Sequence, residues 1–179
     1  MKSTISIPML GVLLLLTGCT QEQVQDTPSE AKQEKAKPMF RSINDTISVS
    51  PQISLDDIAT AKADGVTLII NNRPDGEDPS APQSADIEAA ARAAGMKYIA
   101  IPITHSGFSG PQVDAMIAAL ADGDKALAYC RSGTRSTLLW SLAQAKQGVA
   151  PDEISRLAGN AGYDITPVRA MVDALAASS

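Results

Sequence analysis

The sequence predicts a single α/β domain, in which a mainly parallel β-sheet carries helices on both faces. Short apolar runs alternate with segments of helical composition, the order expected of β-α-β units. The runs at 66–70 and 126–129 are almost entirely apolar, which is typical of strands buried on both sides. Segments rich in Pro, Gly and Asp separate the elements, as loops do.

The first elements are predicted from capping residues and chain breakers. A helix is expected to begin at Ser54, an N-cap with acidic residues after it, and to stop near Gly65. The strand at 66–70 follows, and then a loop over 72–82 that is crowded with Pro, Gly and Asp. The Ala-rich segment 84–94 predicts the next helix, with a glycine as its C-terminal cap.

The remaining elements follow the same alternation. A strand over 98–103 precedes a helix over 111–121, and the last apolar run precedes a helix over 135–147. Pro151 and Pro167 fit the first turns of two further helices. Ligands of such sheets bind beyond the carboxyl ends of the strands, so the loops that leave that edge are expected to form the pocket.

The beginning of the chain predicts a targeting segment. Residues 1–18 hold Lys2 and a short apolar run, and the stretch ends in Leu-Thr-Gly before Cys19, as in a secretory signal. The pattern resembles a bacterial lipoprotein signal, which implies cleavage before Cys19 and attachment of lipid to its thiol. The alternative is an ordinary signal peptide that happens to be followed by a cysteine.

The segment after this signal predicts a tether. Residues 19–40 are mostly Gln, Glu, Lys, Ser and Pro and hold almost nothing to bury, so we expect them to be disordered and the domain to occupy 41–179. Thr20 follows the lipidated position, which by resemblance to Gram-negative sorting implies the outer membrane. The expected location is therefore the cell envelope, with the lipid-anchored domain facing the periplasm.

Charge and composition exclude several classes of function. The net charge of −5 and the lack of a basic run argue against nucleic acid as a partner. One histidine and one free cysteine cannot assemble a usual zinc shell, and we predict neither a metal nor a cofactor. Anion binding must therefore be local, built by a loop and not by a general positive field.

The segment 126–136 carries the strongest functional signal. It leads from a strand through Cys130 into a Gly-containing turn, and Arg135 closes the turn as a helix begins. Backbone N–H groups and the positive end of the helix dipole favour an anion or a thiolate there. A cysteine buried for structural reasons would not need these charges and hydroxyls. We therefore predict Cys130 as the nucleophile and Arg135 as its catalytic partner.

The other residues of the turn are predicted to form an anion-binding loop: Arg131, Ser132, Gly133, Thr134 and Ser136. Gly133 allows a backbone angle that other residues resist. Ser136 either donates a hydrogen bond to the thiolate or caps the helix. Arg131 is expected to point outward, as an electrostatic helper at best.

Two other loops supply a possible pocket wall. Arg73, Asp75 and Glu77 follow a buried strand directly, which favours a pocket wall over an ordinary solvated turn. Asp75 is a candidate to pair with an arginine and hold the geometry of the anion-binding loop. His105 is the only histidine and lies in the loop over 104–110, between a predicted strand and the next helix, so it is a candidate for a catalytic or substrate role. Trp140 is expected to be part of the core.

The sequence of residues 130–136 resembles the active loop of rhodanese-type sulfurtransferases and, more distantly, of cysteine-dependent phosphatases. With residues 67–77 and 98–102, it resembles the bacterial beta-lactamase-hydrolase-like family over about residues 41 to 145. The resemblance implies a dual-specificity-phosphatase-like fold. Members of that family are labelled either phosphatase-like or sulfurtransferase, and some relatives are fused to a persulfide dioxygenase.

Loop length and the missing acid favour sulfur transfer. Four residues separate Cys130 from Arg135, whereas the phosphatase pattern has five, and a tighter loop suits a thiosulfate or a persulfide. No carboxylate lies between Ile101 and Gln112, where related phosphatases keep a general-acid aspartate. We therefore expect a ping-pong sulfurtransferase that forms a Cys130 persulfide. Its partners would be a small sulfur-containing anion or persulfide and a thiol acceptor.

Two alternatives remain open from the sequence. The first is a cysteine-dependent phosphatase that forms a Cys130 phosphoenzyme, with His105 or Asp75 as the acid. The second is a lipoprotein without catalysis, which uses the same loop to bind oxyanions or to sense redox state.

Overall fold

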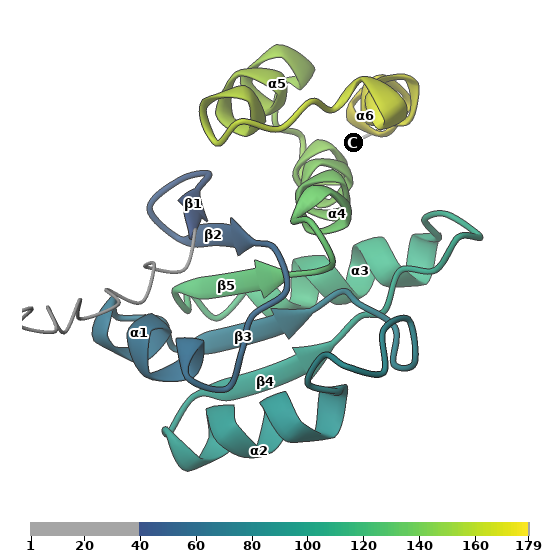
Figure 1. Cartoon of the computed structure of the whole chain (residues 1–179). Coiled ribbons are helices and arrows are strands. Elements are labelled where there is room, and N and C mark those ends of the chain that lie inside the picture. Colours follow the sequence, from purple (N-terminus) through teal and green to yellow (C-terminus); the bar gives the residue numbers. More distant parts are fainter. Residues whose placement is uncertain (1–39, 179) are drawn as a thin grey trace, which may run out of the picture. The chain divides into compact units, whose positions relative to one another are not determined.

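The computed structural model describes residues 40–178. The predicted signal, the lipidation site Cys19 and the tether up to residue 39 lie outside the described residues. The described residues form a sheet of five strands. Figure 1 shows helices on both faces of this sheet, as the sequence predicted. The strands are β1 (Arg41–Ser42), β2 (Ile47–Ser50), β3 (Leu68–Asn71), β4 (Lys97–Ala100) and β5 (Ala126–Tyr129). The helices are α1 (Asp57–Ala63), α2 (Ser84–Ala93), α3 (Gly110–Leu120), α4 (Thr134–Lys146), α5 (Pro151–Asn160) and α6 (Arg169–Ala177), with a 3₁₀ turn, η1, at Thr166–Val168.

The order of the strands, β1-β2-β5-β3-β4, places β5 at the centre of the sheet. Only β1 runs antiparallel to its neighbour. The parallel strands end in register, with Ser50 opposite Tyr129, Tyr129 opposite Asn71, and Asn71 opposite Ala100. The loops that follow these four residues therefore leave from one edge, which is the edge where parallel α/β sheets bind ligands.

Successive side chains along the strands point to opposite faces of the sheet, and a hydrophobic core forms on each face. Ile69 and Leu127 pack with α1 and α2 on one face, whereas Ile70 and Ala128 pack on the other face with α3 and α4. Helix α4 is buried almost all round, because α5 and α6 cover the side that faces away from the sheet (Figure 1). Trp140 is part of this core, as predicted. Among residues 40–178, no helix has the length and apolar character needed to span a bilayer.

The structure corrects three details of the predicted elements. Strands β1 and β2 were not predicted, although β2 is a direct neighbour of β5. The regular part of helix α1 begins at Asp57, three residues after Ser54. Ser54 still has the predicted capping contacts, because its N–H donates to the Asp57 carboxylate at 2.8 Å and its hydroxyl accepts the Asp57 N–H at 3.3 Å. Strand β4 ends at Ala100, three residues before the predicted end at Ile103.

Candidate active site

Cys130 lies in the loop that joins β5 to α4. Its side chain is buried, and its thiol forms no disulfide with any residue in the range 40–178. The Sγ atom accepts a hydrogen bond from the backbone N–H of Gly133 at 3.2 Å. The loop therefore folds back over the sulfur and directs a main-chain dipole at it, an arrangement that stabilises a thiolate.

Gly133 is the N-cap of α4 and has a φ of 87°. This left-handed conformation is open to glycine at little cost, as predicted for this position. The hydroxyl of Ser136 does not cap the helix, and within residues 40–178 its Oγ, which is buried, has no hydrogen-bond partner. Both roles predicted for the Ser136 hydroxyl are therefore absent from this structure.

Main-chain N–H groups of the loop are available for an anion. No acceptor within the described part of the chain is found for the N–H groups of Arg131 and Ser132. The first N–H groups of α4 lack intrahelical partners by the geometry of a helix. Arg131 is exposed, as predicted, so its guanidinium is at the rim of the site. These donors and the helix dipole together form a site suited to an oxyanion.

The guanidinium of Arg135 is fixed by two acceptors from other loops. Nη1 donates to the carbonyl of Ile103 at 2.7 Å, and Nη2 donates to Oε2 of Glu77 at 2.9 Å. Burial opposes the charge on Arg135, but the hydrogen bond to Glu77 and the attraction of Cys130 outweigh it and raise the pKa of the guanidinium. Arg135 is therefore a fixed cation beside the thiol.

The carboxylate of Glu77 joins the two arginines. Its Oε2 also accepts from Nε of Arg73 at 2.7 Å, and Nη1 of Arg73 donates to Oε1 of Gln52 at 2.8 Å. The hydrogen bond from Arg135 lowers the pKa of Glu77 most; partial burial opposes this, and the hydrogen bond from Arg73 lowers the pKa further. Glu77 is thus held as an anion, and the loop after β3 is tied to the loop after β5.

Arg73 and Asp75 do not line the pocket beside Arg135, although both were predicted to form its wall. The side chain of Arg73 is only 8% exposed and lies behind Glu77. The carboxylate of Asp75 accepts the backbone N–H of Ser84 at 2.7 Å, because the first N–H groups of α2 need acceptors outside the helix. Both residues line a separate polar hollow of about 10 Å³ with Tyr129, which has room for little more than one water. The arginine-pairing role predicted for Asp75 belongs to Glu77.

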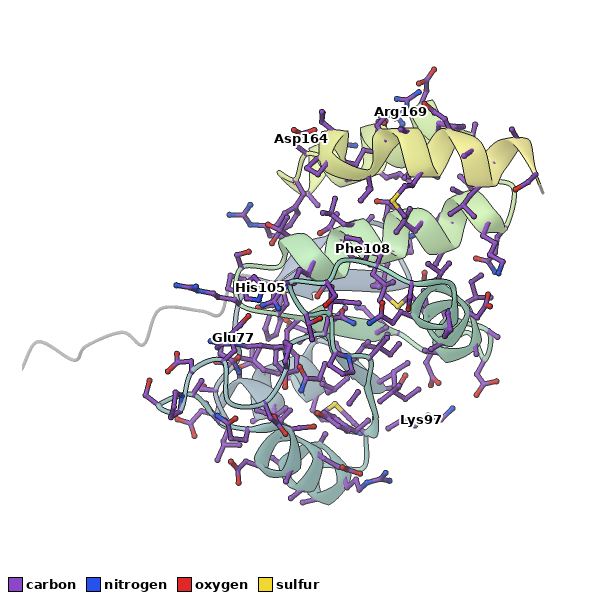
Figure 2. The ribbon with its side chains drawn as sticks, turned by 90° about the vertical axis from the view of Figure 1, so that its right-hand side faces the viewer. Glu77, Lys97, His105, Phe108, Asp164 and Arg169 are labelled. Carbon is purple, nitrogen blue, oxygen red and sulfur yellow. The ribbon has the colours of Figure 1, made fainter. Side chains whose placement is uncertain are left out.

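A pocket opens beside the fixed guanidinium. Its volume is about 220 Å³, and it is lined by Glu77, Thr104, His105, Arg131, Ser132 and Arg135. The loop after β4 thus brings His105 to the same pocket as the residues that follow β5. Figure 2 shows Glu77 and His105 on the same side of the domain.

Comparison with known proteins identifies the family. Residues 39–147 match the model of the beta-lactamase hydrolase-like protein family, phosphatase-like domain. The chain belongs to this family. The resemblance drawn from the active loop and the two apolar strands is therefore confirmed.

Relatives of this phosphatase-like domain agree with that assignment. The beta-lactamase hydrolase-like protein of Xylella fastidiosa is 33% identical over 125 residues, which are 69% of this chain and 29% of the relative. The chain thus spans less than a third of the curated relative that it matches. A candidate phosphatase of Neisseria meningitidis, solved by crystallography, is 31% identical with a TM-score of 0.67 and covers 76% of this chain and 98% of its own.

More distant structures share the fold. A kinase-associated phosphatase, crystallised with its catalytic cysteine replaced by serine, is 16% identical with a TM-score of 0.58. The match covers 73% of this chain and 88% of that one. The phosphatase-like domain therefore has the fold of cysteine-dependent phosphatases. These comparisons favour the phosphatase alternative, and none of them supports the expected sulfurtransferase.

Two residues that contact the site of the phosphatase-like domain were not found from the sequence. Gln52, after β2, holds Arg73, and Tyr163, after α5, donates its hydroxyl hydrogen bond to the carbonyl of Ser132 at 3.2 Å. Neither residue belongs to a motif. Gln52 was missed together with the strand before it, and no pattern in the sequence links Tyr163 to a loop thirty residues upstream.

Proposed function

We propose that this protein is a cysteine-dependent phosphatase that hydrolyses phosphate monoesters through a Cys130 phosphoenzyme. One observation carries the proposal: a single pocket brings together the fixed cation of Arg135, the loop after Cys130 and the imidazole of His105. The likeness to a candidate phosphatase at 31% identity supports it.

The proposed reaction has two steps. The Cys130 thiolate attacks phosphorus, so that an S–P bond forms while the bond from phosphorus to the ester oxygen breaks. Arg135 and the loop N–H groups hold the non-bridging oxygens as charge shifts onto them. Water then attacks the phosphocysteine, which releases inorganic phosphate and restores the thiolate.

His105 is the proposed proton donor to the leaving oxygen. It lines the pocket, whereas Glu77 is held as an anion by two arginines and Asp75 serves the first turn of α2. A protonated imidazole gives its proton to the leaving alkoxide or phenoxide and is recharged when it takes a proton from the attacking water. This role replaces the aspartate that the loop after β4 lacks.

The pocket also bears on the size of the substrate. Its volume of about 220 Å³ is smaller than the roughly 300–1,000 Å³ of pockets for drug-sized ligands. It has room for a phosphoryl group and the first atoms of its ester, while the remainder of the substrate would lie outside.

Aryl phosphates with leaving groups of different basicity test this function. Cys130→Ser is expected to lower kcat/KM by more than about a thousandfold on all of them. His105→Asn is expected to cost about a hundredfold with phenyl phosphate and little with 4-nitrophenyl phosphate, because a weakly basic leaving group needs no proton. Ser106→Ala, on the same exposed loop, is the control and should behave as the parent. Turnover that survives in Cys130→Ser would refute the proposal.

Sulfur transfer is the second candidate. It is favoured by the four-residue spacing between Cys130 and Arg135 and by the lack of a carboxylate between 101 and 112. Intact-mass analysis after incubation with thiosulfate, beside Cys130→Ser, separates the two functions. A gain of one sulfur atom by the parent alone, released by cyanide, would establish the sulfurtransferase; no adduct, together with turnover of aryl phosphates, would exclude it.

A further inference from the structure

The peptide unit between Ser132 and Gly133 is held at both of its ends. Its N–H, from Gly133, donates to Sγ of Cys130 at 3.2 Å. Its carbonyl, from Ser132, accepts the hydroxyl of Tyr163 at 3.2 Å. The N–H and the C=O of a peptide point in opposite directions. Tyr163 therefore holds the side of the peptide that faces away from the sulfur.

Tyr163 is positioned by the chain around it. It follows α5, and its backbone N–H donates to the carbonyl of Ala158 at 2.9 Å. The guanidinium of Arg41 lies over the phenol ring, 5.2 Å from its centroid, in a cation–π arrangement. These contacts hold the main chain and the ring of Tyr163, and they place its hydroxyl against the active loop.

Gly133 and Tyr163 fit closely. A Cβ added at position 133 would overlap the Tyr163 hydroxyl and would lie 2.8 Å from Cζ of the ring. The carbonyl of Gly133 is fixed separately, by the N–H and the hydroxyl of Thr137, each at 3.0 Å. The peptide before Gly133 depends on its own two hydrogen bonds, to Cys130 and from Tyr163. Without them it could rotate, because glycine accepts both negative and positive φ angles.

We propose that Tyr163 is a positioning residue of the Cys130 site, whose hydroxyl holds the Ser132–Gly133 peptide with its N–H toward the sulfur. If that peptide rotated by half a turn, the carbonyl oxygen of Ser132 would face Sγ. The partial negative charge of this oxygen would then disfavour a thiolate. The proposal rests on Cys130 being the nucleophile, as in the proposed function. Nothing in the active-loop motif provides this contact.

The state of the phenol agrees with its role as a donor. Burial raises the pKa of Tyr163; Arg41 acts in the opposite sense, and the nearby Cys130 adds to the rise. This rise favours the protonated hydroxyl, which is the form that donates the hydrogen bond to Ser132.

Tyr163→Phe in the full chain tests the proposal, because it removes the hydroxyl and leaves the ring over Arg41. The ionisation of Cys130 is followed by ultraviolet absorbance against pH, with the matching Cys130→Ser variant subtracted. The midpoint is expected to rise by roughly half a unit to one unit, a three- to tenfold loss of thiolate at lower pH. The midpoint of the pH profile for alkylation of Cys130 by iodoacetamide should rise by the same amount.

Tyr98→Phe is the matched control, because its hydroxyl bonds Asn71 and Ser84 and does not contact the active loop. Its midpoint should equal that of the parent. An unchanged midpoint in Tyr163→Phe, with or without a lower melting temperature, would overturn the proposal. A shifted midpoint in a protein that turns over no phosphate ester would refute the phosphatase function and leave the role of Tyr163 intact.

Discussion

The carboxylate of Glu77 decides how Arg135 is presented to the pocket. One oxygen accepts from both Arg135 and Arg73, and the side chain is only 17% exposed. Partly buried, charge-assisted hydrogen bonds of this kind are stronger than neutral ones. Without the anion, Arg135 would lose one of the two loop acceptors that hold it, and two guanidinium groups would lie close together with no carboxylate between them.

Glu77→Gln is expected to lower kcat/KM for aryl phosphates by about tenfold to a hundredfold, the effect of losing one or two hydrogen bonds between charged groups. Steady-state kinetics at neutral pH measures it. Glu153→Gln removes a carboxylate that pairs with an arginine at the surface, and serves as the control. Equal activity of Glu77→Gln and the parent would contradict this account of the site.

The same carboxylate predicts a dependence of stability on pH. The pKa of Glu77 is lowered in the folded protein from a usual value of 4.5, so its contribution is complete above that value. The contribution is lost as pH falls through the lower, folded pKa. Denaturant unfolding between neutral pH and pH 3 should show a smaller loss of free energy in Glu77→Gln than in the parent. An identical slope in the two proteins would count against the prediction.

The Ser136 hydroxyl predicts a gain in stability on removal. Its Oγ is buried without a partner among the described residues, and an unsatisfied buried hydroxyl is costly. Ser136→Ala is expected to raise the free energy of unfolding by about 1 kcal/mol, as measured with urea. Ser141→Ala on the same helix is the comparison, because that hydroxyl donates to the carbonyl of Thr137 at 2.8 Å and its loss should bring no gain. A destabilised Ser136→Ala would show that the hydroxyl has a partner in solution.

Single residues also show where prediction from sequence fails. The conformation of Gly133 and the burial of Trp140 follow from local chemistry, and both predictions are confirmed. The pairing of Arg135 with Glu77 and not with Asp75 depends on how the loop between β3 and α2 folds. Two carboxylates two positions apart cannot be told apart by composition, because both are compatible with the same turn.

At the scale of elements, α4 is the central helix of the domain. Nine of its residues are buried, because it is packed between the sheet and the pair of helices α5 and α6. It also presents its N-terminus to the active loop. Its packing therefore fixes the position of the helix end from which the site is built.

Leu139→Ala is expected to lower the free energy of unfolding by about 2–5 kcal/mol, because Leu139 is fully buried and the change leaves a cavity. Met171→Ala removes a side chain of similar size that is 44% exposed on α6, and should cost no more than about 0.5 kcal/mol. Urea unfolding of both variants provides the test. Similar losses in the two would mean that α4 is not the packing centre.

Elements bounded by clear helix- and strand-breaking residues were predicted well, and elements without such boundaries were not. Strand β5 has the predicted bounds and α3 differs by one residue at each end, since both lie between clear breakers. Strand β1 has two residues and β2 has four, and Ile-Ser-Val-Ser is too short for alternation to stand out. The pairing of β2 with β5 joins segments far apart in the sequence, and such a contact leaves no mark on local periodicity.

At the scale of the molecule, the helices beyond the family match are part of the folded domain. The family model ends at residue 147, whereas Ile154, Ala158 and Val172 from α5 and α6 are fully buried in the core that contains α4. A boundary drawn from the family model would therefore cut through a hydrophobic core.

A chain that ends after residue 147 is expected to lose cooperative unfolding, because the apolar side of α4 would face water. Circular dichroism during thermal unfolding, with the full chain as the reference, measures this. A chain shortened by Ser178 and Ser179 alone should unfold as the full chain does. A sharp transition for the shorter protein, at an unchanged temperature, would contradict the prediction.

The contact between Tyr163 and the active loop has an evolutionary consequence. Tyr163 lies outside the matched segment 39–147, and the residues from Cys130 to Arg135 lie inside it. Replacement of this tyrosine by phenylalanine during evolution would alter the surroundings of the sulfur without any change in the sequence of the active loop. If Tyr163 positions the peptide as proposed, two proteins with identical active-loop sequences can differ in the reactivity of the cysteine because of a residue outside that loop.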